Sequence, residues 1–501
     1  MRKYFAAALP VLLGAGLLTP VAHAAESITW SKCTTDPLKA AGADCGFVPV
    51  PLDWNNPGGE KIKIAVSRVK HTVPDAQSKG PILVNPGGPG GSGLPWATLG
   101  KRVPGGVGGQ YDWIGFDPRG VGASEPSLSC DPDYMHYNRP AYVPTGENDA
   151  IVQANLKRAK GYAEACAKSP GGKLLNHVKT RDNARDMDAI RAALGAPQIS
   201  YYGFSYGTYL GQVYATLFGK NLKRVVLDGV VDARDIWYQS QLNQDVAFEK
   251  VINIFFEWVA KHNDTYKLGA THTEVQVRYY ADEEKLAKDP AGGKIGGSEF
   301  ADLFLPAGYN QRNWDGIARG WSNWVHKNDT EGLKALYDSA NGPGDDNNYA
   351  IYLATQCSDL KWPRKWSQWY RDNAKTANQA PFYTWANAWY NAPCLYWPAT
   401  PGKQVQISPL DAPPTLILSE TLDAATPYDG AERARAIFPK SRLVATEGGT
   451  THSNSLRGLA CVDSVVATYL STGVLPAANR KHGKPDVVCQ AAPQPTPKPA
   501  G

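Results

Sequence analysis

Clustered metal ligands and a strong excess of one charge are both missing from this 501-residue sequence. It contains no C-x-x-C pair, and its nine histidines are dispersed, so the spacing typical of a zinc site is absent. The formal net charge is +5, and it falls to +3 without the two basic residues of the first 24 positions. Nothing resembles the basic stripe that nucleic-acid binding requires. We therefore expect no metal, no cofactor and no nucleic-acid partner.

Long apolar runs are also missing, except at the start of the chain. Arg2 and Lys3 precede a largely apolar stretch over residues 5–18, and Ala22-His23-Ala24 fits an A-x-A cleavage site. The stretch is interrupted by Pro10 and is shorter than the roughly 20 residues needed to span a bilayer. The pattern predicts a secretory signal over residues 1–24 rather than a membrane anchor. We expect a secreted, extracellular protein that is monomeric and not attached to a membrane.

Eight cysteines follow the predicted signal, and an even number in an exported chain suggests four disulfides. Eight cysteines allow 105 pairings, so the connectivity is a guess from proximity in the sequence. That guess pairs Cys33–Cys45, Cys130–Cys166, Cys357–Cys394 and Cys461–Cys489.

Short apolar segments alternate with helical patterns in the first half of the chain. Residues 61–69 alternate like a half-exposed strand, and four shorter runs are typical of buried strands, at 82–84, 113–116, 199–202 and 225–227. A helix is predicted over residues 182–194. This alternation predicts an α/β fold with a mostly parallel sheet covered by helices on both faces.

The strand pattern stops between about residues 233 and 400, a region that holds eleven of the fifteen tryptophans at largely helical spacing. It resumes at residues 415–418 and 442–445. We predict a core in two parts, 25–232 and 401–490, interrupted by a helical, aromatic-rich cap over 233–400. Residues 491–501 are rich in proline and are predicted to form an extended, disordered tail.

The most informative motif is Gly203-Phe-Ser-Tyr-Gly207, which follows a predicted strand and precedes an apolar helical run. This order is typical of the nucleophile elbow of α/β-hydrolases, in which the serine lies at a sharp turn between strand and helix. Ser205 is therefore the candidate nucleophile.

A serine needs a base to take its proton, and in this fold the order along the chain is serine, acid, histidine. Only His452 and His482 follow the resumed strands, and His452 is favoured because it follows the strand at 442–445 and a small-residue loop. Asp423, after the strand at 415–418, is the preferred acid. Asp228, after the strand at 225–227, is its rival, and Glu420 is a weaker candidate because it is too close to its strand.

Acyl transfer also needs backbone N–H donors for the oxyanion. Tyr206, which follows the serine, is one expected donor. The second is expected from the loop Asn85-Pro-Gly-Gly-Pro-Gly-Gly-Ser-Gly93, with Gly88 preferred and Gly87 as the alternative. The loop is not followed by G-K-[ST], so a nucleotide site is not indicated.

Four ordered motifs, Asn85–Gly90, Gly115–Ser124, Gly203–Gly207 and the Asp423…His452 end, resemble the secreted tripeptidyl aminopeptidases of actinobacteria. These are relatives of the proline iminopeptidases within the α/β-hydrolase superfamily. The resemblance implies a serine exopeptidase that releases tri- or tetrapeptides from free N-termini, with a helical cap over the site and no cofactor.

The same motifs leave two other functions open. A carboxylesterase or lipid-ester hydrolase uses the same three residues, and a non-catalytic binding protein is the less favoured third interpretation. An aminopeptidase needs carboxylates to hold the substrate ammonium group, for which Glu249, Glu257 and Asp359 of the cap are weak candidates.

Asp117-Pro-Arg119, in the second of the four motifs, closes a strand end near the expected cleft. It either fixes the glycine-rich loop through an arginine–carboxylate pair or caps the edge of the sheet. The structural role at the sheet edge is favoured.

Overall fold

The computed structural model describes residues 27–341, 343–479 and 483–498. The predicted signal over residues 1–24 and the alternative base His482 lie outside the described residues.

A ten-stranded sheet forms the centre of the molecule, in the order β1-β2-β3-β5-β4-β6-β7-β8-β9-β10. All strands from β5 to β10 in this order run parallel, and β1–β3 are antiparallel. The strand bounds are β1 Ser31–Lys32, β2 Asp44–Pro51, β3 Lys61–Val69, β4 Pro81–Asn85, β5 Asp112–Phe116, β6 Ile199–Phe204, β7 Leu222–Asp228, β8 Thr415–Glu420, β9 Ser441–Glu447 and β10 Val487–Gln490. The mostly parallel sheet predicted from the sequence is confirmed, and β1, β2 and β10 are additions at its edges.

Alternate residues of the central strands point to opposite faces of the sheet, so the strands contribute to two separate cores. Leu83 and Tyr201 pack on the face covered by α2 (Thr180–Ala193), α3 (Tyr206–Phe218) and α13 (Asp429–Ile437). Ile82 and Tyr202 face the 3₁₀ helices η2 (Leu94–Arg102) and η3 (Pro104–Gln110) and α14 (Ala460–Thr472). Strands buried on both faces explain the continuous apolar runs in the sequence.

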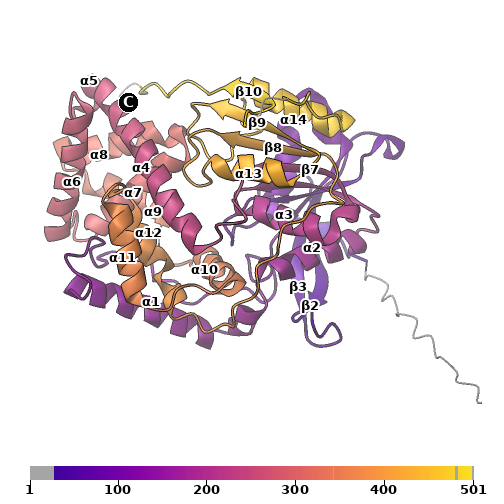
Figure 1. The fold of residues 1–501 in the computed structure, drawn as a ribbon, viewed down its shortest axis with the longest axis horizontal. Coiled ribbons are helices and arrows are strands. Elements are labelled where there is room, and N and C mark those ends of the chain that lie inside the picture. The colour runs from indigo at the N-terminus through magenta and orange to yellow at the C-terminus, as the bar shows by residue number, and fades with distance from the viewer. Residues whose placement is uncertain (1–26, 342, 480–482, 499–501) are drawn as a thin grey trace, which may run out of the picture.

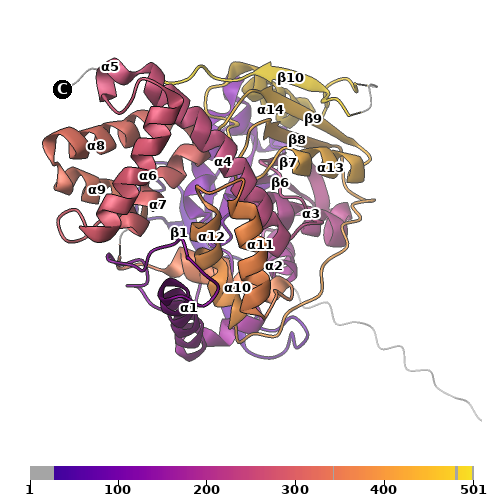
Figure 2. The same cartoon turned by 60° about the vertical axis from the view of Figure 1, so that its left-hand side comes forward.

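In the part of the chain that the structure describes, the helices inserted between β7 and β8 form a cap beside the sheet (Figure 1). They are α4 Tyr238–Lys261, α5 Asn263–Tyr266, α6 His272–Lys288, α7 Gly297–Tyr309, α8 Trp314–Lys327, α9 Thr330–Asn341, α10 Asn347–Asp359, α11 Trp366–Ala377 and α12 Thr384–Asn391. Much of the cap has its own aromatic core, which includes Phe255, Trp258, Trp314 and Trp321. In Figure 2 the long helix α4 runs from beside the sheet to the far end of the cap.

The cap also includes chain from the first half of the sequence. Helix α1 (Ala150–Lys168) lies below α10–α12 in Figure 1. The Tyr162 hydroxyl donates to Asp346 Oδ2 at 2.7 Å, and Trp389 Nε1 donates to the carbonyl of Tyr142 at 2.7 Å. The segment around α1, which the sequence analysis assigns to the core, therefore packs against the inserted helices.

Residues 491–498, the described part of the proline-rich tail, lie along the cap. Trp258 Nε1 donates to the carbonyl of Pro495 at 2.8 Å, and Gln311 Nε2 donates to that of Pro493 at 3.1 Å. Arg319 donates to the carbonyl of Lys498 at 2.6 Å. Prolines leave carbonyl oxygens without competing N–H groups, so an extended proline-rich segment suits cap side chains that donate hydrogen bonds.

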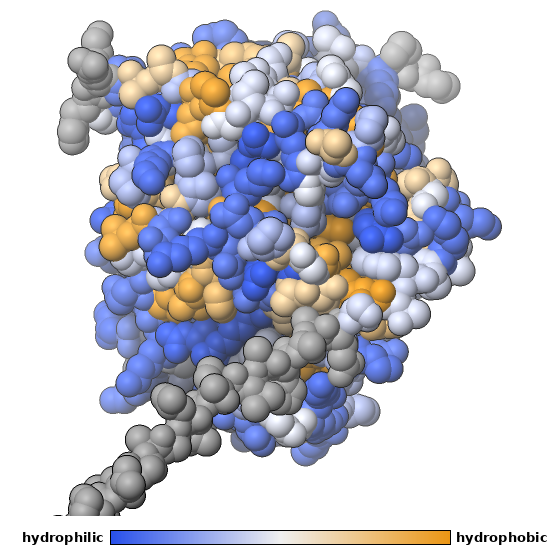
Figure 3. Space-filling model, turned by 90° about the vertical axis from the view of Figure 1, so that its right-hand side faces the viewer, coloured by the Kyte–Doolittle hydropathy of each residue, from blue (hydrophilic) through white to orange (hydrophobic). Residues whose placement is uncertain are grey.

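Figure 3 shows the face at the right of Figure 1, where hydrophobic residues occur in separate small groups among hydrophilic ones. Across the described ranges, no helix combines the length and apolarity that crossing a membrane would need. Those same ranges hold no group of three or more histidine, cysteine, aspartate or glutamate side chains placed to bind a metal ion.

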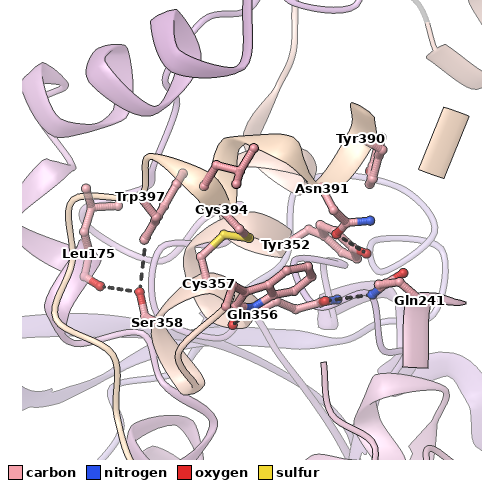
Figure 4. The surroundings of a disulfide bond; sticks show 12 residues. Leu175, Gln241, Tyr352, Gln356, Cys357, Ser358, Tyr390, Asn391, Cys394 and Trp397 are labelled. Atoms are coloured by element: carbon pink, nitrogen blue, oxygen red, sulfur yellow. Dashed lines mark hydrogen bonds between the residues drawn. A yellow bond between two sulfur atoms is a disulfide. The ribbon is translucent and has the colours of Figure 1, made fainter. Parts of the chain in front are cut away.

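The eight cysteines form four disulfides, Cys33–Cys45, Cys130–Cys166, Cys357–Cys394 and Cys461–Cys489. These are the pairs suggested by proximity in the sequence. Figure 4 shows that Cys357–Cys394 joins α10 to the 3₁₀ helix η7 (Ala392–Leu395), beside Tyr352 and Gln356. Gln356 accepts a hydrogen bond from Gln241 Nε2 of α4 at 2.9 Å. This disulfide therefore secures a part of the cap where several helices meet.

We expect the double substitution Cys357→Ala/Cys394→Ala to lower the free energy of unfolding by roughly 2–4 kcal/mol, because it releases a long loop of the unfolded chain. Calorimetry should detect a lower thermal midpoint. Cys33→Ala/Cys45→Ala is the matched control, because it opens a shorter loop, with a separation of 12 rather than 37 residues. An unchanged midpoint for the first variant would contradict the expectation.

Candidate active site

Ser205 lies between the end of β6 and the start of α3, with φ 54° and ψ −126°. This conformation is unusual for a residue with a side chain, and it is the strained turn expected of a nucleophile elbow. The turn depends on its glycines, because a Cβ at Gly203 would lie 2.4 Å from the carbonyl oxygen of Gly207. Within the described residues, the Ser205 hydroxyl has no hydrogen-bond partner, and the residue lines a cavity.

His452 and Asp423 lie in direct contact. His452 Nδ1 is 2.8 Å from Asp423 Oδ2 and 3.0 Å from Oδ1. Asp423 Oδ1 also accepts hydrogen bonds from the N–H groups of Ala425 and Thr426, both at 3.0 Å. Burial on its own would lower the pKa of His452, but the Asp423 carboxylate outweighs it, so the pKa is raised.

The two rival carboxylates lie near His452 but bind its loop instead of its ring. Asp228 Oδ2 accepts from Ser455 N at 2.9 Å and from the Ser455 hydroxyl. Glu420 accepts from Thr451 N and from Asn454 Nδ2, the latter at 2.7 Å. Burial raises the pKa of Asp228 to about 6 and that of Glu420 to about 7. Both carboxylates therefore support the loop that carries His452.

The elbow and the histidine loop meet at the end of β7. The carbonyl of Asp228 accepts a hydrogen bond from Ser205 N at 3.0 Å and another from Ser453 Oγ at 3.2 Å. The next residue, Gly229, leaves room for the imidazole, because a Cβ there would lie 2.9 Å from His452 Cε1. The fold thus brings Ser205 and His452 to one strand end.

The glycine-rich loop packs directly against the elbow. A Cβ at Gly87 would lie 2.8 Å from the Cβ of Ser205, which explains the requirement for glycine. The N–H of Gly87 is already bound to Asn85 Oδ1 at 3.0 Å. The N–H of Gly88 has no partner among the described residues, and Gly88 lines the same cavity as Ser205 and Tyr206. Of the two candidates in this loop, Gly88 alone keeps its N–H available.

Asp117 and Arg119 have separate roles. Asp117 Oδ1 accepts hydrogen bonds from Ser92 Oγ at 2.6 Å and Gly93 N at 2.9 Å, and so fixes the end of the glycine-rich loop. Arg119 instead forms a buried bidentate pair with Asp186 of α2, at 2.7 and 2.6 Å. The alternative in which an arginine–carboxylate pair holds the glycine-rich loop is therefore wrong, because the carboxylate binds that loop without the arginine.

A cavity of about 590 Å³ lies above Ser205, between the strand ends and the cap. Its floor includes Gly88, Ser205 and Tyr206. Residues of α4, α7, α10 and α12 form much of its wall, including Gln241, Tyr309, Tyr352, Gln356 and Tyr390. The inserted helices therefore enclose the space in which a substrate would meet the serine.

The three cap carboxylates suggested from the sequence do not line this cavity. Glu249 accepts from Phe382 N at 3.0 Å, Asp359 accepts from Thr180 N at 2.7 Å, and Glu257 is exposed beside Lys261. Glu249 and Asp359 accept hydrogen bonds from backbone N–H groups, which explains why these carboxylates lie away from the cavity.

The acidic residues that do line the cavity are Asp232, Asp235, Asp423 and Asp429, against the bases Lys250 and Arg433. Sequence reasoning missed Asp232 and Asp235. Their position in the segment that follows β7 was an available signal, since residues that follow parallel strands line sites at the carboxyl edge of a sheet.

Comparison with known proteins shows the family to which the chain belongs. Residues 380–489 match a family described as TAP-like protein. A tripeptidyl aminopeptidase of Streptomyces coelicolor is 39% identical over 501 residues, which cover 97% of this chain and 90% of the relative. The chain belongs to the tripeptidyl aminopeptidase family of α/β-hydrolases.

Two further relatives extend the range of this family. A serine protease of Mycobacterium tuberculosis is 30% identical, with 91% of each chain covered. Carboxylesterase B of the same organism is 31% identical, covering 92% of this chain and 91% of the relative. As a member of the tripeptidyl aminopeptidase family, the protein is a serine hydrolase related to peptidases, which excludes the interpretation as a non-catalytic binding protein.

We expect Asp117→Asn to lower kcat by about 10-fold, because the amide would present a donor to N–H groups that now meet a carboxylate and would displace the glycine-rich loop. Steady-state kinetics with a peptide amide would measure this loss. Arg119→Lys is the control, since its pair with Asp186 lies away from this loop, and it should lower stability with little change in kcat. Equal losses of kcat in both variants would contradict the separate roles.

Proposed function

We propose that this protein is a secreted exopeptidase that releases tri- or tetrapeptides from the free N-terminus of peptides. The family supports peptide hydrolysis, and the name of the Streptomyces relative supplies the expected product length. The signal pattern of residues 1–24 and the four disulfides support export.

In the proposed mechanism, Ser205 Oγ attacks the scissile carbonyl while its proton moves to His452 Nε2. Asp423 holds the imidazole through Nδ1 and stabilises the cation that forms. The N–H groups of Tyr206 and Gly88 donate hydrogen bonds to the developing oxyanion. The proton on Nε2 then passes to the leaving amine, and water releases the short peptide from Ser205 in a second, equivalent cycle.

The cavity between the strand ends and the cap is the observation that carries the exopeptidase proposal. Its volume of about 590 Å³ lies within the range of sites for small ligands. A space roofed by helices admits the end of a peptide and excludes the middle of a folded chain. The same enclosure limits how many residues fit between the peptide end and Ser205.

The charge of the cavity wall supports recognition of a free N-terminus. Four carboxylates face two basic side chains. Arg433 lies 2.7 Å from Asp232 Oδ2, and it is farther from Asp429, at 3.5 Å, and from Asp235, at 3.8 Å. Burial and the neighbouring Asp232 raise the pKa of Asp235, so an arriving ammonium group would be favoured there. Asp235 is our candidate for the ammonium partner.

Ester hydrolysis is the second candidate function, favoured by the 31% identity to carboxylesterase B. The same three residues perform both reactions, so the two functions differ in what the cavity wall recognises.

The pH dependence of kcat/KM should report the raised pKa of His452. The imidazole must be neutral to accept the serine proton, so activity should fall as the pH decreases through a value above 6.5. Ser205→Ala, expected to lose roughly 10⁴-fold in kcat, gives the background rate. Circular dichroism over the same pH range would check that the fold persists. An acid limb near pH 5 would contradict the assignment.

The specificity test compares a free tripeptide amide with its N-acetylated form. We expect the acetylated substrate to have a kcat/KM at least about 100-fold lower, roughly 2.7 kcal/mol, because it lacks the charge and adds bulk. Asp235→Asn should raise KM about 10-fold for the free substrate alone. Glu257→Gln, which changes an exposed carboxylate outside the cavity, is the matched control. Equal kcat/KM values for the two substrates in the wild-type protein would favour an endopeptidase or esterase instead.

A further inference from the structure

Ser453, which directly follows His452, has a contact that the proposed mechanism does not use. Its Oγ lies 3.4 Å from His452 Nε2, the nitrogen that receives the serine proton, and 3.2 Å from the carbonyl of Asp228. The residue is buried and has a φ of 54°, in the left-handed region. Serine adopts this conformation rarely, and such strain concentrates at functional sites.

The positions of the hydrogens determine which hydrogen bonds the Ser453 hydroxyl can donate and accept. The Asp423 carboxylate only accepts hydrogen bonds, so His452 Nδ1 carries a hydrogen. Nε2 is then an acceptor in the neutral ring and a donor in the cation. Ser453 has one hydrogen, and its donation to the Asp228 carbonyl leaves an oxygen lone pair for Nε2. A hydroxyl that accepts at this position suits the protonated imidazole, in which Nε2 is a donor.

We propose that Ser453 Oγ accepts a hydrogen bond from protonated Nε2 of His452 and stabilises the imidazolium formed during acyl transfer. The proposal rests on the proposed function, in which the Ser205 Oγ–H bond breaks, its proton joins Nε2, and Oγ bonds the substrate carbonyl carbon. Ser453 stabilises the protonated imidazole until Nε2 gives its proton to the leaving amine.

Gly229 makes the arrangement possible. A Cβ at this position would lie 2.6 Å from Ser453 Oγ and 2.9 Å from His452 Cε1. The imidazole and the hydroxyl therefore lie together over the end of β7, where any larger residue would displace one of them.

Several other groups act on the same ring. Asp423 from the β8–α13 loop and Asp228 from β7 favour its protonation, and Arg457 of its own loop opposes it. The ring of Tyr309 from α7 packs against the imidazole at 5.7 Å between centroids. Glu420 binds the loop through the backbone of Thr451. A change at Ser453 leaves all of these groups in place, so its effect on the imidazole can be isolated.

The test measures the His452 pKa by NMR of ¹³Cε1-labelled histidine in the Ser205→Ala protein, with Ser453 intact or replaced by alanine or glycine. We expect both replacements to lower the pKa by about 0.5–1 unit, because the cation loses an acceptor. An unchanged or higher pKa would overturn the proposal, since a hydroxyl that mainly donates to neutral Nε2 would give a rise. Thr450→Val is the matched control, because the Thr450 hydroxyl is buried in the same loop and has no hydrogen-bond partner among the residues that the structure describes.

Kinetics with p-nitrophenyl acetate complete the test in the protein that retains Ser205. Both Ser453 variants should lower kcat about 3–10-fold and move the acid limb to lower pH. Glycine suits a positive φ and alanine does not, so the two variants should differ in thermal midpoint but agree in pKa. If the changes in kcat and in the His452 pKa differed between the two variants as their thermal midpoints do, Ser453 would have a structural role and the proposal would be overturned. The NMR titration does not require an active enzyme, and hydrolysis of p-nitrophenyl acetate does not require recognition of a peptide. The role of Ser453 can therefore be tested even if the exopeptidase proposal fails.

Discussion

One main-chain hydrogen bond, from Ser205 N to the carbonyl of Asp228, couples the two halves of this site. It extends the parallel pairing of β6 with β7, in which Phe204 lies beside Asp228. Parallel strands end at the same edge of a sheet, so the serine turn and the histidine loop meet there. The same carbonyl also binds Ser453. A change in the register of β7 would therefore move both loops at once.

Buried carboxylates hold the irregular loops around this junction. Asp117 binds the glycine-rich loop, Asp228 binds Ser455, and Glu420 binds Thr451. Loops without a regular hydrogen-bond pattern leave backbone N–H groups that need acceptors when they are buried. A carboxylate can accept several such bonds, which explains why acidic residues gather around a site that uses only one of them to orient the imidazole.

The cap is connected to the catalytic core at several separated points. The carbonyl of Tyr309, at the end of α7, accepts a hydrogen bond from His452 N at 2.8 Å, so the roof of the cavity also supports the base. The tail binds α4 and α8 from outside. The Cys357–Cys394 disulfide joins α10 to η7 within the cap (Figure 4). Movements of the cap would thus affect His452 as well as the substrate space.

The sequence by itself determined the alternation of strands and helices, the elbow at Ser205 and the helical insertion, because each depends on local periodicity or on a short turn motif. It also placed Asp423 and His452 after successive strands. Only the tertiary structure separated Asp117 from Arg119, assigned Glu420 and Asp228 to loop support, and brought Asp235 to the cavity. Those outcomes depend on which backbone groups remain without partners once distant segments pack. Local periodicity and short motifs do not reveal which distant segments pack together.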